Sequence, residues 1–369
     1  MSRRTRSTPR PSPPSPTSPA RTVGSPLAVR DRDYLLDRRG VIFKVIGDVH
    51  PDSHYLGYVK YHPDPKGDRH LFGTRYRQNS VVSKSFGILA DRPECYLYSP
   101  ALGCVITGLP RQDTTHHYSA RHALRQLHTH RALAGRALVG RDLLAVIDHI
   151  IEAGHADLFG ITGSFLVGCH TPRSDIDLVC YGPTGYQAAQ HLFTTQHLIR
   201  PYAGDDLTRL YLRRAKYMAG SSFDALLRQE QRKLQGLTPT ADAHINCEPL
   251  RDDDDPAFVR MTAKEIGDVT LLARITDHTH GLATPALYGI EVTTILNATI
   301  DEPDRLAPRI THLRSYLGAY TGAFRAGDLL HIAGKLVHLH DGHHTGFGVE
   351  LTPWSTGTSY LAHLTAQRP

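Results

Sequence analysis

Two aspartates that are two residues apart are the best candidates in this sequence for chemistry. Asp175 and Asp177 lie in the apolar stretch Asp175-Ile176-Asp177-Leu178-Val179. Alternate side chains of a β-strand point the same way, so both carboxylates would share one face, about 6–7 Å apart. Like charges on a half-buried face repel each other, and a divalent cation removes that repulsion. The pair therefore predicts a metal site, where two Mg²⁺ ions could serve phosphoryl or nucleotidyl transfer.

Gly163 and Ser164 precede this pair and form a candidate phosphate site. A short apolar run, typical of a strand, comes before them, and the glycine permits a tight turn from that strand into a helix. The free amides and the hydroxyl at the start of a helix can bind phosphate. Arg173 and Ser174 stand directly before the aspartate pair and are further candidates for contact with a triphosphate.

Together these residues resemble the motif of the nucleotidyltransferase superfamily, which includes DNA polymerase β, the CCA-adding enzymes and the antibiotic nucleotidyltransferases. That motif is a Gly-Ser pair, about ten residues, and then acid–apolar–acid on a strand; here ten residues separate Ser164 from Asp175. The close match covers about 25 residues, and the order of expected elements extends it loosely to residue 250.

The resemblance implies that a hydroxyl or another nucleophile attacks the α-phosphate of a nucleoside triphosphate and that pyrophosphate leaves. It implies that Asp175 and Asp177 hold two Mg²⁺ ions, with Mn²⁺ as an alternative. It also implies that Gly163 and Ser164 hold the β- and γ-phosphates. The acceptor stays open: an RNA 3′ end, a protein hydroxyl that receives AMP, or a small molecule.

The family normally adds a third carboxylate from a neighbouring strand. Glu248 is our first choice, because it lies on the polar face of the alternating segment 243–250. Asp242, Asp252 and Asp254 are the alternatives. If no third acid reaches the metals, the chain would instead be a non-catalytic nucleic-acid-binding or regulatory protein that keeps the fold.

The elements that must position these residues indicate an α+β protein. We expect a central nucleotidyltransferase-like mixed sheet with helices, flanked by an N-terminal β-rich module and a small C-terminal β-barrel-like module. The expected parts are a disordered tail at 1–30, an accessory domain at 31–118, a catalytic domain at 119–250, an acidic linker at 251–264 and the barrel-like domain at 265–369.

Periodicity in the apolar residues predicts the individual elements. The expected helices lie within 119–151 and at 186–198, 206–218 and 223–234. The expected strands lie at 41–46, 55–61, 157–162, 175–181, 243–250, 269–275, 287–296, 329–339 and 347–351. Gly334 lies inside one of these strands and suggests a bend or bulge there.

Composition narrows the class of protein. The 369 residues carry a formal charge of +6, but residues 1–30 hold six arginines and no acids, so the remaining 36 basic residues balance the 36 acidic ones. A neutral folded part argues against a long duplex substrate.

The tail is rich in Pro and Ser, which favours disorder. No apolar run is long enough to span a membrane. The five scattered cysteines fit reduced thiols in a cytoplasmic protein.

Four other polar clusters have plainer explanations. A turn explains Gly47-Asp48-Val49-His50, although this run superficially resembles a metallophosphoesterase motif, and an Asp-Gly hairpin turn lies between the histidines of the second cluster, His338, His340, His343 and His344. A solvated helix face, which could also meet a polyanion, explains Arg209, Arg213, Arg214 and Lys216. A loop that could bind a ligand contains the fourth cluster, Arg75, Tyr76, Arg77, Asn79, Lys84 and Ser85.

Overall fold

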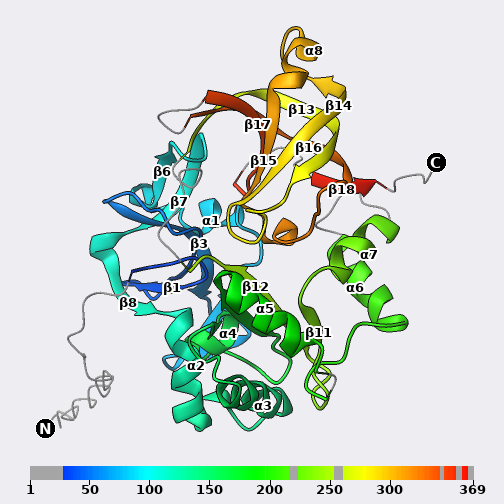
Figure 1. Ribbon diagram of the computed structural model, residues 1–369. Coiled ribbons are helices and arrows are strands. Elements are labelled where there is room, and N and C mark those ends of the chain that lie inside the picture. The colour runs from blue at the N-terminus through cyan, green and yellow to red at the C-terminus, as the bar shows by residue number, and fades with distance from the viewer. Residues whose placement is uncertain are drawn as a thin grey trace, which may run out of the picture.

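Figure 1 shows a computed structural model of the chain, which is a mixed α+β protein with several sheets. The structure describes residues 28–195, 197–215, 223–252, 261–340, 345–354 and 360–364. Most of the predicted tail, the centre of the acidic linker, Lys216, and His343 with His344 lie outside the described residues.

An antiparallel sheet of eight strands forms the N-terminal part. Its main path runs β4-β5-β3-β2-β1-β8, while β7 pairs with the start of β3 and with β6. Alternation in β3 buries Val59 and Tyr61 and leaves Tyr58 and Lys60 half-buried. The bounds are β1 Tyr34–Asp37, β2 Ile42–Val45, β3 His54–Pro63, β4 Arg69–Leu71, β5 Thr74–Gln78, α1 Lys84–Ile88, β6 Tyr96–Ser99, β7 Cys104–Pro110 and β8 Thr114–Tyr118.

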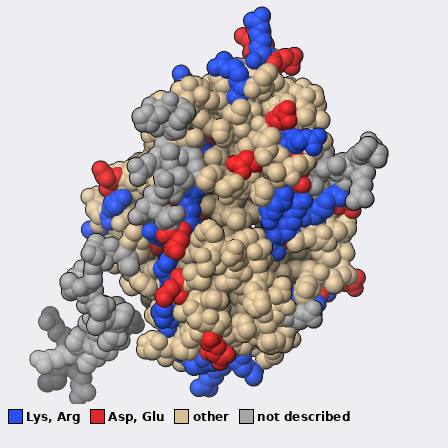
Figure 2. All heavy atoms as spheres, in the orientation of Figure 1, with Lys and Arg blue, Asp and Glu red and all other residues tan. Residues whose placement is uncertain are grey.

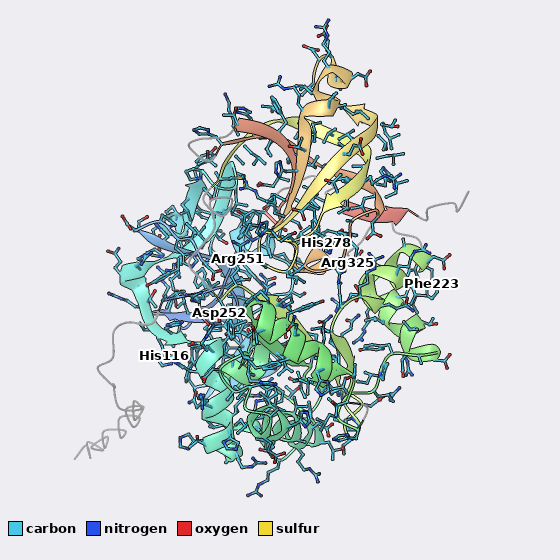
Figure 3. The ribbon with its side chains drawn as sticks, in the orientation of Figure 1. His116, Phe223, Arg251, Asp252, His278 and Arg325 are labelled. Carbon is cyan, nitrogen blue, oxygen red and sulfur yellow. The ribbon has the colours of Figure 1, made fainter. Side chains whose placement is uncertain are left out.

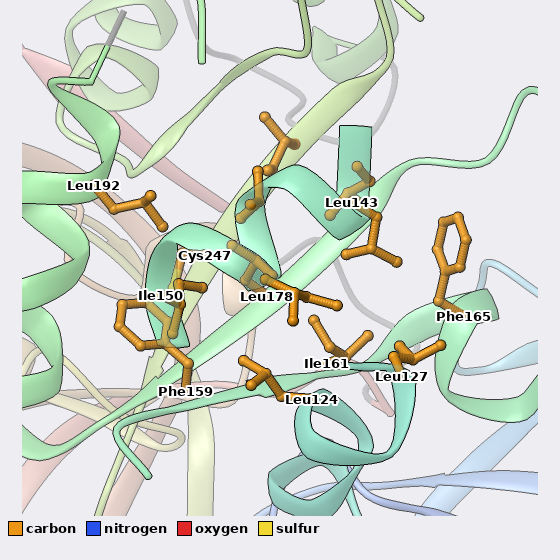
Figure 4. Packing of buried hydrophobic residues seen from close by; sticks show 14 of the residues in the cluster. Leu124, Leu127, Leu143, Ile150, Phe159, Ile161, Phe165, Leu178, Leu192 and Cys247 are labelled. Atoms are coloured by element: carbon orange, nitrogen blue, oxygen red, sulfur yellow. The ribbon is translucent and has the colours of Figure 1, made fainter. Parts of the chain in front are cut away.

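The middle part contains a four-stranded sheet in the order β11-β12-β10-β9, with β10 and β12 parallel. The helices α2 and α3 cover it, and their leucines and isoleucines interlock with the strands (Figure 4). The predicted helical stretch at 119–151 is two helices, interrupted at Gly135, whose φ of +76° suits glycine.

The bounds in this part are close to the predicted ranges. The helices are α2 Ala120–Thr129, α3 Leu138–Glu152, α4 Gly163–Val167, α5 Gly182–Phe193, α6 Asp205–Ala215 and α7 Phe223–Gln231. The strands are β9 Phe159–Ile161, β10 Ile176–Tyr181, β11 Gln235–Leu237 and β12 His244–Leu250. Two differences matter: Asp175 precedes its strand by one residue, and α5 begins at Gly182, four residues before the predicted start.

Five strands of the C-terminal part close into a ring, β13-β14-β15-β17-β16 and back to β13. The strands β15 and β18 were not predicted, because polar residues interrupt the first and the second is short. The bounds are β13 Thr262–Asp277, β14 Ala286–Ala298, α8 Pro303–Leu306, β15 Ile310–Ser315, β16 Leu329–His340, β17 Thr345–Leu351 and β18 Tyr360–Leu364.

Of the bend or bulge predicted at Gly334, the strand register shows no bulge. The strand β16 keeps its register with β13 through this residue. Instead, β16 changes partner here, pairing with β18 up to Ala333 and with β17 from Lys335. A Cβ on Gly334 would lie 2.7 Å from a methyl of Leu351, so the glycine permits close packing inside the barrel.

The three parts pack against one another through shared apolar clusters. Tyr34 and Ile42 of the N-terminal sheet pack in one cluster with Val167, the last residue of α4, while Trp354 of the barrel part packs on that same sheet. Arg251 and Asp252 follow β12 and lie between the middle part and the barrel (Figure 3). No helix among the described residues combines the length and apolarity needed to cross a membrane.

Candidate active site

Asp177 lies in β10 directly against the backbone of Gly163. Gly163 has a φ of +70°, and a Cβ added to it would lie 2.1 Å from Asp177 Oδ2. Only glycine therefore fits at the first position of α4 with this carboxylate in place. The other oxygen, Oδ1, accepts a hydrogen bond of 2.8 Å from the side-chain amide of Asn246 on the parallel strand β12. Both ends of the Asp177 carboxylate are thus fixed.

Asp175 precedes β10 and shares a cavity with Asp177. The side chain keeps access to solvent, yet the cavity walls replace much of its water. This desolvation, together with the nearby charge of Asp177, raises the pKa of Asp175 from 3.8 to about 6, against the opposing charges of Arg213 and Arg214. The expected repulsion between the two carboxylates is therefore present.

The raised pKa of Asp175 predicts a pH-dependent cost in stability. Between pH of about 4 and 6 the folded protein binds more protons than the unfolded chain, so its free energy of unfolding falls as pH rises. Asp175→Asn removes this effect and should raise the free energy of unfolding at pH 7 by at most about 1 kcal/mol, because solvent screens the charge. Urea denaturation of metal-free protein at pH 4.5 and 7 tests it. An equal gain at both pH values would contradict it, and Asp157→Asn is the exposed control.

Glu248 lines the same cavity but is not an unpaired carboxylate. Its side chain forms an ion pair with the buried guanidinium of Arg32, from just before β1. Burial alone would raise the pKa of Glu248, but the charges of Arg32 and Lys44 lower it to about 2. The Arg32 guanidinium also packs 2.9 Å from the position of a Cβ on Gly318, in the barrel part. The pair joins all three parts of the molecule.

The register of β10 and β12 places Asn246, not Glu248, beside Asp177. Glu248 stands opposite Val179, one step further along the sheet face. Among the described residues, no three or more His, Cys, Asp or Glu side chains are grouped as a metal site. The interpretation of Glu248 as the third metal ligand is thus not supported by this arrangement, because Arg32 holds its carboxylate.

Breaking the Arg32–Glu248 pair should destabilise the protein. Arg32→Met leaves a negative charge without its partner and should cost about 3 kcal/mol in free energy of unfolding. Glu248→Gln in the same chain should restore part of that loss, because it removes the unpaired charge. Denaturant titrations of both single variants and the double variant measure the coupling. The exposed pair of Arg125 and Asp157 is the control, where Arg125→Met should change little.

The cavity has a volume of about 420 Å³ and is built by all three parts. Besides the three carboxylates, its wall contains five cationic side chains: Arg32, Lys44, Arg214, Arg232 and Lys233. Figure 2 shows Lys and Arg side chains gathered at mid-height on one face of the molecule, where the barrel approaches α6 and α7. A cavity with this charge suits a polyanionic ligand.

His244 and Asn246 each present a buried polar atom without a hydrogen-bond partner among the described residues. His244 lines the cavity at β12; its Nδ1 lies 2.6 Å from the hydroxyl of Tyr202, and its Nε2 is unpartnered. Burial and the charges of Arg214 and Arg213 lower the pKa of His244 to about 3, so the imidazole is neutral. Asn246 Oδ1 is likewise buried and unpartnered. Buried polar atoms of this kind are rare and mark places where a ligand can bind.

The remaining site residues lie beside the cavity rather than in its wall. Ser164 is buried at the start of α4, which has five residues. Ser174 is also buried, and its hydroxyl accepts hydrogen bonds from Arg69 and from the Thr171 amide at 2.9 and 2.8 Å. Arg173 is exposed and does not line the cavity. Ser174 thus shapes the loop before β10, and triphosphate contact by Arg173 or Ser174 has no support here.

The alternative candidates for the third acid, and the polar cluster of the N-terminal part, form ion pairs and hydrogen bonds away from the two aspartates. Asp242 pairs with Arg200, and Asp252 with Arg121, both near the surface; Asp254 lies outside the described residues. In the N-terminal donor cluster, Arg77 pairs with Asp64, while the Asn79 amide binds the backbone of Val59. These contacts are structural, as hairpin and loop residues require.

Comparison with protein-family models, with curated proteins and with solved structures finds no match to this chain. The site therefore has to be judged on its own geometry.

Sequence reasoning missed the residues that the N-terminal part contributes to the cavity. Arg32, Lys44 and Tyr58 are more than a hundred positions before the aspartates, and nothing in their local pattern links them to Asp175 or Asp177. His244 and Asn246 had a usable signal, because alternation in 243–250 puts them on the same face as Glu248. What was missing was the strand register, which decides the neighbour of Asp177.

Proposed function

We propose that this protein is a Mg²⁺-dependent nucleotidyltransferase, which transfers a nucleoside monophosphate from a nucleoside triphosphate to an acceptor hydroxyl and releases pyrophosphate. One observation carries the proposal. Asp175 and Asp177 open into a cavity rich in Arg and Lys, yet neither carboxylate has an ion-pair partner within 4.0 Å among the described residues. Two unpaired acids inside a cationic wall fit a metal ion that stands between them and a polyphosphate.

The donor atoms present fit a hard divalent cation. Asp175 and Asp177 supply carboxylate oxygens, and the unpartnered Oδ1 of Asn246 adds a neutral amide oxygen beside them. Mg²⁺ and Mn²⁺ accept such oxygens and tolerate a mixed set completed by water and phosphate. When bound, the metal would neutralise charge on the phosphates during transfer. Asn246 thus stands beside Asp177, whereas the predicted third acid, Glu248, stands opposite Val179.

The chain's own residues would bind and orient the substrate. Gly163 and Asn246 hold the Asp177 carboxylate in a fixed position, so little reorganisation is needed when ligand binds. The cationic wall attracts the triphosphate, and residues from three parts of the chain build that wall. The resemblance to the nucleotidyltransferase motif supports the same reaction.

A non-catalytic protein with this fold is the second candidate. The observation that favours it is that, among the described residues, no unpaired third carboxylate lies beside the two aspartates, because Glu248 is paired with Arg32 and an amide stands beside Asp177. Such a protein would bind nucleotide or nucleic acid without turnover.

A labelled-nucleotide assay separates the two candidates. The protein is incubated with each α-labelled nucleoside triphosphate, Mg²⁺ or Mn²⁺, and separate pools of RNA, protein and metabolite acceptors. Release of pyrophosphate with transfer of label to one pool supports the enzyme and identifies the acceptor class. Nucleotide binding without release in any pool supports the non-catalytic protein. Release that survives Asp175→Ala combined with Asp177→Ala would overturn the assignment of the site.

A further inference from the structure

One lysine of the N-terminal sheet, Lys44, lines the cavity that also holds Asp175 and Asp177, and a second, Lys60, lies near it on the neighbouring strand. Lys44 in β2 is directly paired with Tyr58 in β3, and both side chains line the cavity. Lys60 lies two residues further along β3 than Tyr58. The register shifts here, since Ile42 pairs with Tyr61 and Phe43 with Val59, so Lys60 is the extra residue of a β-bulge. Bulges redirect side chains and are frequent beside functional sites.

Both ammonium groups lie within electrostatic reach of the acidic side of the site. The charges of Asp177 and Glu248 act to raise the pKa of Lys60, although its burial lowers that pKa overall. The charge of Lys44 helps to lower the pKa of Glu248. Strands more than a hundred residues before β10 thus contribute positive charge to the same cavity.

These two lysines differ from Lys233 and the arginines of the cavity wall in having no acidic partner among the described residues. Arg32 pairs with Glu248, Arg232 with Asp328, and Lys233 with Glu230; Arg214 lies 3.9 Å from that same glutamate. Lys44 and Lys60 form no ion pair among the described residues. A half-buried ammonium group without a counterion is costly. Its charge can be compensated by a ligand that brings negative charge into the cavity.

We propose that Lys44 and Lys60 bind the β- and γ-phosphates of the nucleoside triphosphate, so that the N-terminal sheet forms one wall of the nucleotide site. The inference rests on the proposed function and adds the residues that hold the polyphosphate. Charge balance supports it: two Mg²⁺ ions compensate a fully ionised triphosphate, which leaves Asp175 and Asp177 to be balanced by two cations. A lysine ammonium is a compact point charge and a frequent ligand of phosphate.

Inorganic tripolyphosphate is the probe, because it contains the three linked phosphates of the nucleotide and has no nucleoside to transfer. Its affinity for the full chain is measured by isothermal titration calorimetry with Ca²⁺, in wild type, Lys44→Met, Lys60→Met and the double variant. Each single substitution should weaken binding about tenfold and the pair about a hundredfold, since each removes one charge-assisted contact. Lys84→Met is the matched control in the same part of the chain, and it should bind as wild type does.

Two further measurements keep the outcomes separate. Lys44→Arg and Lys60→Arg retain the charge and should recover most of the affinity, and thermal unfolding of every variant detects loss of fold. Wild-type affinity in the folded double Met variant, or no binding of tripolyphosphate by wild type, overturns the inference. If pyrophosphate release is normal in that double variant, the lysines are excluded and the proposed function stands. If tripolyphosphate binding depends on the lysines but no nucleotide is ever turned over, the proposed function fails and the polyphosphate site stands.

Discussion

Replacing Asp177 by asparagine should reduce nucleotidyl transfer by at least about 10³-fold. The substitution keeps the size of the side chain, and it removes the negative charge that faces the cavity beside Asp175. Loss of one metal-binding carboxylate removes about 4 kcal/mol of electrostatic stabilisation, which corresponds to that factor. The measurement is release of pyrophosphate from the preferred nucleoside triphosphate at saturating Mg²⁺.

The Asp177 result is informative only if the fold survives. Asp157→Asn is the matched control, because Asp157 is an exposed aspartate of the same part of the chain, paired with Arg125. It should retain full activity and stability. Because asparagine can still accept the hydrogen bond from Asn246, the Asp177→Asn variant should unfold at nearly the wild-type temperature. Transfer by Asp177→Asn within tenfold of wild type would show that this carboxylate does not bind the metal.

Gly163→Ala should destabilise the protein by roughly 3 kcal/mol and abolish activity. The left-handed backbone conformation at Gly163 costs a residue with a Cβ about 1–2 kcal/mol of conformational free energy. In addition, the new Cβ would overlap Asp177 Oδ2, so the carboxylate or the turn has to move. Urea denaturation gives the change in free energy of unfolding, and the pyrophosphate assay gives the activity.

Gly168 offers a control that separates the two causes. It ends the same helix, α4, with a φ of +74°, but nothing lies within 4 Å of the position of its Cβ. Gly168→Ala should therefore show the backbone cost alone, about 1–2 kcal/mol, and keep most of the activity. Equal losses of stability and activity in both variants would mean that the contact between Gly163 and Asp177 has no special role.

The sequence predicted the local elements of the middle part well, because the signals there are strong. The leucines and isoleucines of α2 and α3 recur at helical spacing, and the apolar strand β10 and the alternating strand β12 lie close to the positions expected. In the C-terminal part, β15 was missed. Thr311 and His312 interrupt the apolar pattern of this strand. Arg314 is polar as well, yet its side chain is fully buried and forms an ion pair with Glu350. A paired buried charge gives no hydrophobic signal.

The interpretation of Glu248 shows where a strand pattern stops being informative. Alternation along 243–250 correctly groups His244, Asn246 and Glu248 on one face. The alternation contains no information about the register of β12 with β10. A shift of that register by two residues decides whether an amide or an acid lies beside Asp177. Register depends on packing of the whole sheet, and so on residues far away in the chain.

Short-range features of this protein were determined by the sequence alone. The spacing of Gly163, Ser164, Asp175 and Asp177 depends on local chain geometry, since a tight turn and an alternating strand need only a few consecutive residues. The tertiary structure alone decided which distant residues complete the site. Arg32 holds Glu248, Asn246 holds Asp177, and Lys44 lines the same cavity as both aspartates. Those contacts arise because pairing within the middle sheet and packing of the three parts bring separate strands together, and no local pattern encodes a distance between them.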